Sequence, residues 1–522
     1  ANTTGSFNVA IGSEGLKVNT TGTDNVAIGG KTLDANVTGG ANTAIGRSAL
    51  GANTTANYNT AVGHSALKVN TTGTSNTAVG ANALDANTTA LGCTALGNSA
   101  LGANTTGNAN TALGVNSSFT NSTGTQNVSV GNDSLTQNST GSQNTAVGVF
   151  ALNSSTTASL NTGVGYGALS SNTTGTDNTS VGANSLDANT TGANNTAMGR
   201  HALGANTTGT ANTAVGTNAL EINTTGNNNT AIGFKVLDAN TTGLRNTGIG
   251  QSALGKNTTA DDNVAIGTQA LFNNTTGEDN TALGSFSLTS NTTAHNNTAV
   301  GKSALSANTT ASDNTALGYQ ALTANTTGFS NCAFGKDALV SNTTAPNNTA
   351  VGRSALALVT TGEQNTAVGR SAGNVITSGS NNLTLGYNSD PSSATADNEV
   401  TLGDTNIATL RCNVQTISSL SDARDKTNVI DLPEGLDFVT KLRPVKFEWA
   451  TRDGNGKDGS YEHGFIAQDL QAAQKENDAD YLNMVMDENP DRLEASYGKL
   501  VPILVKAIQE LTIEVNKLKS NG

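Results

Sequence analysis

The chain has 522 residues, of which 59 are glycine, 4% are aromatic and 12% are charged, so it is neither an ordinary globular enzyme nor a charged disordered chain. Its net charge of −13, without any cluster of lysine and arginine, argues against a nucleic-acid partner, because binding phosphates requires clustered positive charge. No apolar run approaches the roughly 20 residues that span a bilayer, so we expect no membrane insertion.

Most of the chain is a repeat. A glycine recurs every 17 residues, without insertion or deletion, from Gly12 to Gly403, which gives 24 coils. The residue before each of these glycines is apolar, the residue two before it is small, and the residue four after it is Leu in 20 of the 24 copies. Such a fixed period indicates a solenoid, in which each repeat buries its apolar side only against its neighbours. Residues 1–403 are therefore predicted to form a mostly β rod, a parallel β-solenoid or β-roll.

Each coil is expected to contain a short Asn-Thr-Ala-Val strand, a glycine turn, an Ala-Leu segment and an Asn-Thr-Thr-Gly turn. Asn stands four residues before the glycine in 22 of the 24 coils, with Cys93 and Glu399 as the exceptions. Stacked at one position, these side chains predict an asparagine ladder. The small alanine opposite the valine suits close contact between chains, so we expect an oligomer that packs through its alanine face.

The pattern Asn59-Thr60-Ala61-Val62-Gly63 with the following Ala66-Leu67 resembles the head repeats of trimeric autotransporter adhesins, although their usual repeat is shorter. The resemblance implies a left-handed β-roll in a homotrimer. Asn-Thr-Thr triplets such as Asn70-Thr71-Thr72 are interpreted as turns. Because the sequence begins inside a repeat, we expect a fragment whose upstream attachment part precedes Ala1. The widely separated cysteines predict no disulfide and no metal site, and no cofactor is expected.

The last coils depart from the repeat, since Ser389-Asp390-Pro391 replaces the Ala-Leu segment, and they are predicted to close the rod. Residues 404–420 are predicted to form a connecting strand or linker. The last 102 residues hold 32 of the 65 charged side chains and the only tryptophan, Trp449. A different kind of domain is therefore expected over 421–522.

Four motifs follow Leu420 in order: Ser421-Asp422-Ala423-Arg424-Asp425-Lys426, Leu442-Arg443-Pro444-Val445, His463-Gly464-Phe465-Ile466-Ala467-Gln468 and Tyr497-Gly498-Lys499-Leu500. Together they resemble the intramolecular chaperone of phage endosialidases and tail fibres, a self-cleaving α+β domain. The resemblance implies that Ser421 and Lys426 form a catalytic dyad and that the chain is cut once, in cis, between Leu420 and Ser421. A serine hydroxyl needs an adjacent base to become a nucleophile, and a lysine serves as that base only when burial lowers its pKa.

The final helix is predicted from about 497 to 519. Its apolar residues recur at steps of three and four, the a and d pattern of a coiled coil, and we predict that they hold the trimer together: Val501, Leu504, Ile508, Leu511, Val515 and Leu518. The family resemblance implies three strands in this coiled coil.

These features predict a homotrimeric phage tail fibre or spike, made in the host cytoplasm and carried on the virion. Its expected partners are itself and a host cell-surface receptor, most simply a glycan. A bacterial trimeric surface adhesin is one alternative, disfavoured by the chaperone motifs and by the lack of a C-terminal membrane barrel. A glycan depolymerase is another, disfavoured because the rod shows no paired carboxylates.

Overall fold

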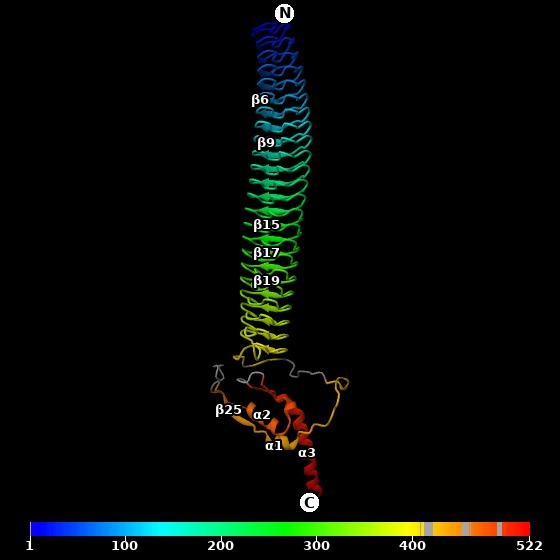
Figure 1. Ribbon diagram of the computed structural model, residues 1–522, viewed down its shortest axis with the longest axis vertical. Helices are drawn as coiled ribbons and strands as arrows, with labels where there is room; N and C mark the ends of the chain where they lie inside the picture. The colour runs from blue at the N-terminus through cyan, green and yellow to red at the C-terminus, as the bar shows by residue number, and fades with distance from the viewer. Residues whose placement is uncertain are drawn as a thin grey trace. The chain divides into compact units, whose positions relative to one another are not determined.

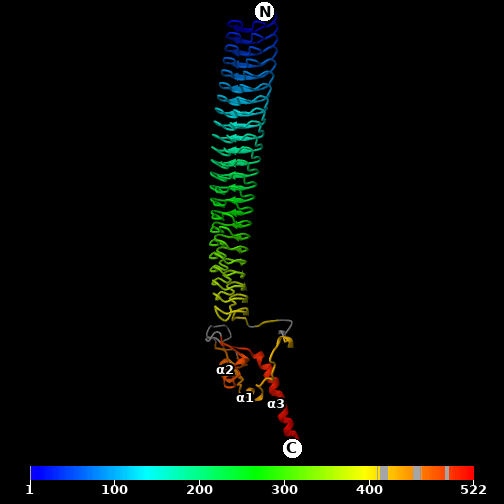
Figure 2. The same ribbon diagram turned by 45° about the vertical axis from the view of Figure 1, so that its right-hand side comes forward.

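The computed structural model describes residues 2–407, 409–411, 421–450, 459, 461–487 and 493–521, and the chain divides into two units, residues 1–337 and 338–522. It confirms the predicted fold class, a 24-stranded parallel β-solenoid with a 17-residue period, followed by a small part of mixed helices and strands. Within each unit the strands stack in chain order (Figures 1 and 2).

Each coil contributes one strand of three residues. In the first unit these are β1 Val9–Ile11, β2 Val26–Ile28, β3 Thr43–Ile45, β4 Thr60–Val62, β5 Thr77–Val79, β6 Thr94–Leu96, β7 Thr111–Leu113, β8 Val128–Val130, β9 Thr145–Val147, β10 Thr162–Val164, β11 Thr179–Val181, β12 Thr196–Met198, β13 Thr213–Val215, β14 Thr230–Ile232, β15 Thr247–Ile249, β16 Val264–Ile266, β17 Thr281–Leu283, β18 Thr298–Val300, β19 Thr315–Leu317 and β20 Cys332–Phe334. The second unit contains β21 Thr349–Val351, β22 Thr366–Val368, β23 Leu383–Leu385 and β24 Val400–Leu402. Within each unit, consecutive strands pair in parallel and in register, so Thr196 lies beside Thr213.

The repeated glycine is required by the close approach of one coil to the next. Gly199 follows β12 with φ +134°, in the region that favours glycine. A Cβ added there would lie 2.6 Å from the backbone carbonyl carbon of Gly216. Any other residue at this position would therefore push two coils apart, which accounts for the unbroken 17-residue glycine register.

We predicted that the alanine face of each strand contacts a neighbouring chain and that the valine face is buried. The structure shows the opposite. The alanine in the middle of the strand and the leucine of the following turn are fully buried within the single chain, as Ala214 and Leu220 illustrate. The apolar residue before the glycine points outward instead, and Ile232 and Leu317 remain 39% and 44% exposed. The alanine face is therefore filled by the chain itself, because the turn folds its leucine onto that face and leaves room for only a small partner.

That leucine occupies an unusual backbone conformation. Leu203 has φ +53°, and most coils repeat this left-handed geometry at the same position. Such a conformation costs an L-residue about 1–2 kcal/mol, whereas burying a leucine side chain returns about 1.5–3 kcal/mol. The Leu203 N–H also donates to the carbonyl of Ala219 in the next coil at 3.0 Å. Burial and the inter-coil hydrogen bond together offset the strain, so the Ala-Leu segment is a turn.

The predicted asparagine ladder is present. Asn195 Nδ2 donates to Asn178 Oδ1 at 3.2 Å and to the carbonyl of Gly209 at 2.8 Å. Its Oδ1 accepts from both the backbone N–H and Nδ2 of Asn212, at 3.0 and 3.2 Å. At Cys93 the thiol takes the place of the amide and donates to Gly107 O at 3.2 Å, and burial raises the pKa of this thiol. Every polar atom of a typical rung is thus satisfied inside the coil.

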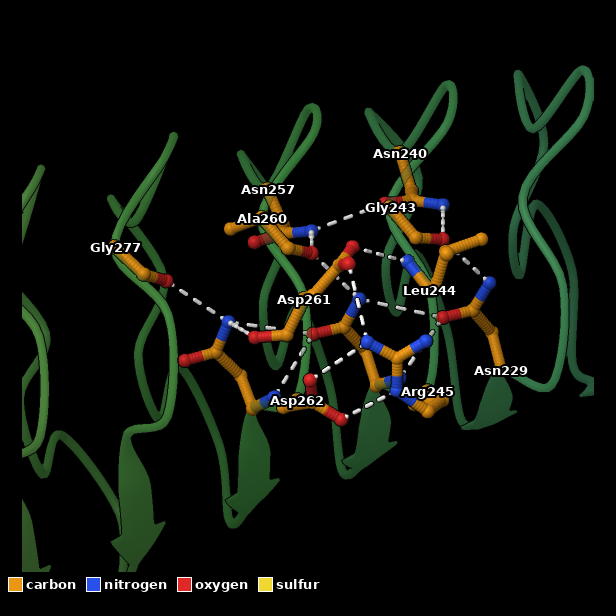
Figure 3. Close-up of polar contacts among 12 residues, drawn as sticks. Asn229, Asn240, Gly243, Leu244, Arg245, Asn257, Ala260, Asp261, Asp262 and Gly277 are labelled. Atoms are coloured by element: carbon orange, nitrogen blue, oxygen red, sulfur yellow. Dashed lines mark hydrogen bonds and ion pairs between the residues drawn. The ribbon is translucent and has the colours of Figure 1, made fainter.

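A second ladder was not predicted. After the first coil, the asparagine of each Asn-Thr-Thr triplet is buried rather than placed on the surface, and Asn206 Nδ2 donates to Asn189 Oδ1 at 2.9 Å. It also donates to Gly209 O at 3.0 Å, the same carbonyl that accepts from Asn195 of the first ladder. Figure 3 shows this arrangement two coils further on, where Asn240 and Asn257 belong to the second ladder and Asn229 to the first. One carbonyl per coil therefore joins the two amide rows.

Replacing Asn195 with Ala is expected to destabilise the solenoid by about 1–3 kcal/mol, because it leaves the buried backbone N–H of Asn212 without an acceptor and removes one donor each from Asn178 Oδ1 and the Gly209 carbonyl. Hydrogen exchange of the amides in neighbouring coils measures the effect. Asn194→Gly is the matched control, since Asn194 is exposed and its φ of +60° suits glycine. Equal protection in both variants would contradict a stabilising role for the ladder.

In the second unit the first ladder ends at Glu399. The Glu399 N–H still donates to Asn382 Oδ1 at 2.9 Å, as an asparagine would. The side chain turns to Ser392, whose N–H and hydroxyl both donate to the carboxylate. A carboxylate has no proton to donate to the neighbouring rung at neutral pH, so the amide row stops here.

The C-terminal part is a small assembly of helices and strands. Its elements are η1 Ala423–Asp425, α1 Leu436–Lys441, β25 Val445–Glu448, β26 Tyr461–Gly464, α2 Ala467–Glu476, η2 Asp480–Leu482, β27 Val485–Met486, β28 Glu494–Ala495, η3 Tyr497–Lys499 and α3 Leu500–Ser520. The pairs β25–β26 and β27–β28 are antiparallel. Its core gathers Phe438, Leu470, Met484, Val485, Leu500 and Ile503. The predicted last helix thus begins as a 3₁₀ turn and becomes α-helical at Leu500.

Candidate functional site

Ser421 and Lys426 lie in direct contact. Lys426 Nζ donates to Ser421 Oγ at 2.6 Å and lies 3.4 Å from the carbonyl oxygen of the same serine. The family resemblance implies that these two residues form a dyad, and the structure brings their side chains together. A hydroxyl within hydrogen-bond distance of an amine is the geometry that nucleophile activation requires.

A short turn produces this contact. Asp422 is the N-cap of η1, and its Oδ1 accepts from the backbone N–H of Arg424 at 2.9 Å. The guanidinium of Arg424 also bonds the same carboxylate, which lowers the pKa of Asp422. The turn folds the chain back so that Lys426 reaches Ser421. Sequence reasoning did not single out Asp422 and Arg424, although an aspartate that bonds the N–H two residues on is a common turn signal.

The surroundings of the dyad are open in the single chain. Both Ser421 and Lys426 are exposed to solvent. A lysine becomes a general base when burial disfavours its charged form, and the isolated chain does not supply that burial. The other half of the predicted scissile bond, Leu420, lies outside the described residues. The single chain therefore positions a hydroxyl beside an amine but leaves both in water.

The predicted trimerisation residues form an unpaired apolar seam along α3. All six are exposed, from 38% for Val515 to 74% for Leu518, the others being Val501, Leu504, Ile508 and Leu511. The helix buries Leu500, Ile503 and Ala507 on the side that faces the domain core. Glu510 further fixes this helix, because its Oε2 accepts from the Leu436 N–H at the start of α1 at 2.7 Å. The seam is thus held in place with no covering partner within the described residues.

In the part of the chain that the structure describes, no group of three or more His, Cys, Asp or Glu side chains is arranged to hold a metal ion. No helix there is both long enough and apolar enough to cross a membrane.

The Peptidase S74 family model, described as the chaperone of endosialidase, matches residues 421–478. This match confirms the resemblance recognised in the sequence. The matched segment begins at Ser421 and contains the dyad, α1, β25, β26 and α2. Together with the long β-solenoid, the endosialidase-type chaperone fits a tail fibre that carries an intramolecular chaperone domain. No curated protein matches the chain.

Proposed function

We propose that the chain is part of a homotrimeric phage tail fibre that serves host attachment, and that its chaperone domain aligns three chains and then cuts itself off between Leu420 and Ser421. The observation that carries the cleavage is the 2.6 Å contact between Lys426 Nζ and Ser421 Oγ at the first residues of the chaperone match. Trimer assembly supplies the burial that the single chain lacks, so that cutting is coupled to correct association.

The outward apolar row supports association between chains. In each coil of the first unit one Val, Ile, Leu, Met or Phe before the glycine stays partly exposed on the outer side of the sheet. At roughly 60 Å² for each side chain, 20 coils present on the order of 1,000 Å² of contiguous apolar surface, compared with about 300–600 Å² for the largest patch on a typical monomer. A standard interface buries about 800 Å² per partner. The row is therefore large enough for a stable interface with further copies of the chain.

Regular repeats create the need for a chaperone. Two chains displaced by one 17-residue coil lose only the contacts of one end coil, so misaligned trimers are almost as stable as the correct one. A domain that trimerises first, through the α3 seam, fixes the alignment before the coils pack. Removing that domain afterwards takes away the nucleus for unfolding and refolding, which stabilises the fibre kinetically.

The mass of the protein in solution tests the proposed trimer. Purified chains are expected to have three times the mass of one solenoid, and unheated samples to resist detergent more than heated ones on a denaturing gel. A monomeric mass at micromolar concentration would overturn the proposal.

A lysine triple variant locates the interface. Val215→Lys, Ile232→Lys and Ile249→Lys together place three charges on the outward row and are expected to abolish the trimer, because buried unpaired charges cost several kcal/mol each. Thr208→Lys, Thr225→Lys and Thr242→Lys form the matched control, since these threonines are exposed on the Asn-Thr-Thr turn. Loss of the trimer in the control alone would place the interface on that turn instead.

The proposed location is the virion, outside the cell after release, and the proposed external partner is a glycan of the host surface. Binding of the purified fibre to host cells, compared with cells stripped of surface polysaccharide, tests attachment. Release of reducing sugar ends during incubation would instead indicate a depolymerase.

A further inference from the structure

One coil of the first unit carries a hollow at a position where it departs from the repeat. The position two residues after the repeat glycine holds a residue with a side chain in every coil except one, where it is Gly167. Its neighbours in the stack, 17 residues to either side, are Phe150 and Asn184. A Cβ at Gly167 would lie 2.7 Å from Asn184 Oδ1. The missing side chain leaves a hollow of about 350 Å³ on the solenoid surface.

Two aromatic side chains form one side of this hollow. Phe150 and Tyr166 come from consecutive coils, and their rings meet edge to face, with centroids 6.0 Å apart and planes at 82°. They are nevertheless 39% and 58% exposed. A tyrosine ring held in place by a second aromatic, with much of its surface in water, offers an apolar face to a ligand.

The remaining lining is polar and uncharged. It includes Ser154, Ser171 and Asn184, with no charged side chain among the lining residues. In the described part of the chain no hydrogen bond involves the hydroxyls of Ser154 and Ser171, whereas the nearby Asn153 Nδ2 donates to Asp133 O at 2.9 Å. Hydroxyl groups of this kind can donate to and accept from a ligand.

We propose that this hollow binds one pyranose ring of a neutral glycan. A pyranose has an apolar C–H face, which packs on the Tyr166 ring, and a rim of hydroxyls, which bond Ser154, Ser171 and Asn184. The volume of about 350 Å³ lies at the small end of ligand sites, which span about 300–1,000 Å³. The uncharged lining favours a neutral sugar over an anionic one. This inference rests on the proposed attachment function, and the homotrimer would present three copies, so that weak single sites act together.

The test measures binding of the full chain to an array of neutral and anionic oligosaccharides. Tyr166→Ala removes the stacking face, and Gly167→Asn fills the hollow with the residue that Asn184 provides in the next coil. Both variants are expected to weaken binding of a neutral oligosaccharide at least tenfold. Tyr319→Ala is the control, because Tyr319 occupies the same position in a coil without the glycine and is 44% exposed. Unchanged solution mass shows that the variants are folded.

Absence of neutral-glycan binding, or binding that both hollow variants leave unchanged, overturns the inference. Adhesion of the same proteins to host cells separates this failure from failure of the attachment function. If the wild-type chain and its Tyr166→Ala and Gly167→Asn variants bind host cells equally well, the attachment function stands and the proposed sugar site in the hollow is refuted. A chain that binds neutral sugar through the hollow but no host cell refutes attachment alone.

Discussion

Ser421→Ala and Lys426→Ala are each expected to keep the chain at its full 522 residues, whereas the wild-type chain loses a C-terminal piece of 102 residues. The serine variant lacks the attacking oxygen. The lysine variant lacks the amine that lies 2.6 Å from it. Loss of a nucleophile or its base typically slows such chemistry by a factor on the order of 10³ or more, so the variants remain intact during expression.

Intact-mass spectrometry of freshly purified protein checks this result, and the N-terminal residue of the small fragment identifies the bond that is cut. Lys475→Ala serves as the control, since Lys475 is an exposed lysine of α2 in the same domain. Normal processing of both dyad variants, or a fragment that begins elsewhere than Ser421, removes the dyad from the mechanism. An uncut Lys475→Ala chain would show that loss of cleavage is not specific to Lys426.

Leu511→Asp is expected to give insoluble or monomeric protein. Leu511 lies in the middle of the exposed seam of α3, beyond the last residue that the helix buries in its own domain, Ala507. The substitution therefore leaves the single domain folded but places three carboxylates together in the proposed coiled coil. Burying such charges without partners costs several kcal/mol each, which exceeds what fewer than three heptads return.

Light scattering coupled to size-exclusion chromatography measures the outcome. Asn516→Asp adds the same charge to the same helix at an exposed position outside the seam, and it should leave the trimer intact. A soluble trimer of correctly aligned Leu511→Asp chains would mean that another surface sets the alignment.

The sequence was sufficient for the period, the parallel register and the first asparagine ladder, because each follows from one residue type recurring at one position. The prediction of which face of each strand is buried was wrong. Valine is more apolar than alanine, so hydrophobicity alone favours burying Val215 over Ala214. Ala214 is nevertheless the buried residue, because the leucine of the following turn folds onto the alanine face and fills the interior. That turn depends on leucines such as Leu203 with positive φ, which no propensity rule anticipates.

The candidate site could be predicted only in part from the sequence. The pairing of Ser421 with Lys426 came from the ordered motifs of a family, and the turn capped by Asp422 explains how five residues bring the two groups together. The burial that would activate the lysine could not be predicted from one sequence, because it depends on other copies of the chain. In the sequence, the hollow at Gly167 appears only as a glycine at a repeat position that holds a residue with a side chain in the other coils. Only the structure shows which side chains lie beside that glycine.

A stack of parallel coils shares a hazard with amyloid, since any bare terminal coil is a template on which another chain can lengthen the sheet. The end at Glu399 is protected chemically. Its carboxylate is turned to Ser392, whose N–H and hydroxyl both donate to it, and Pro391, next to that serine, has no N–H to offer. An incoming coil therefore meets a charged carboxylate in place of a ladder amide, which discourages end-on polymerisation of finished solenoids into filaments.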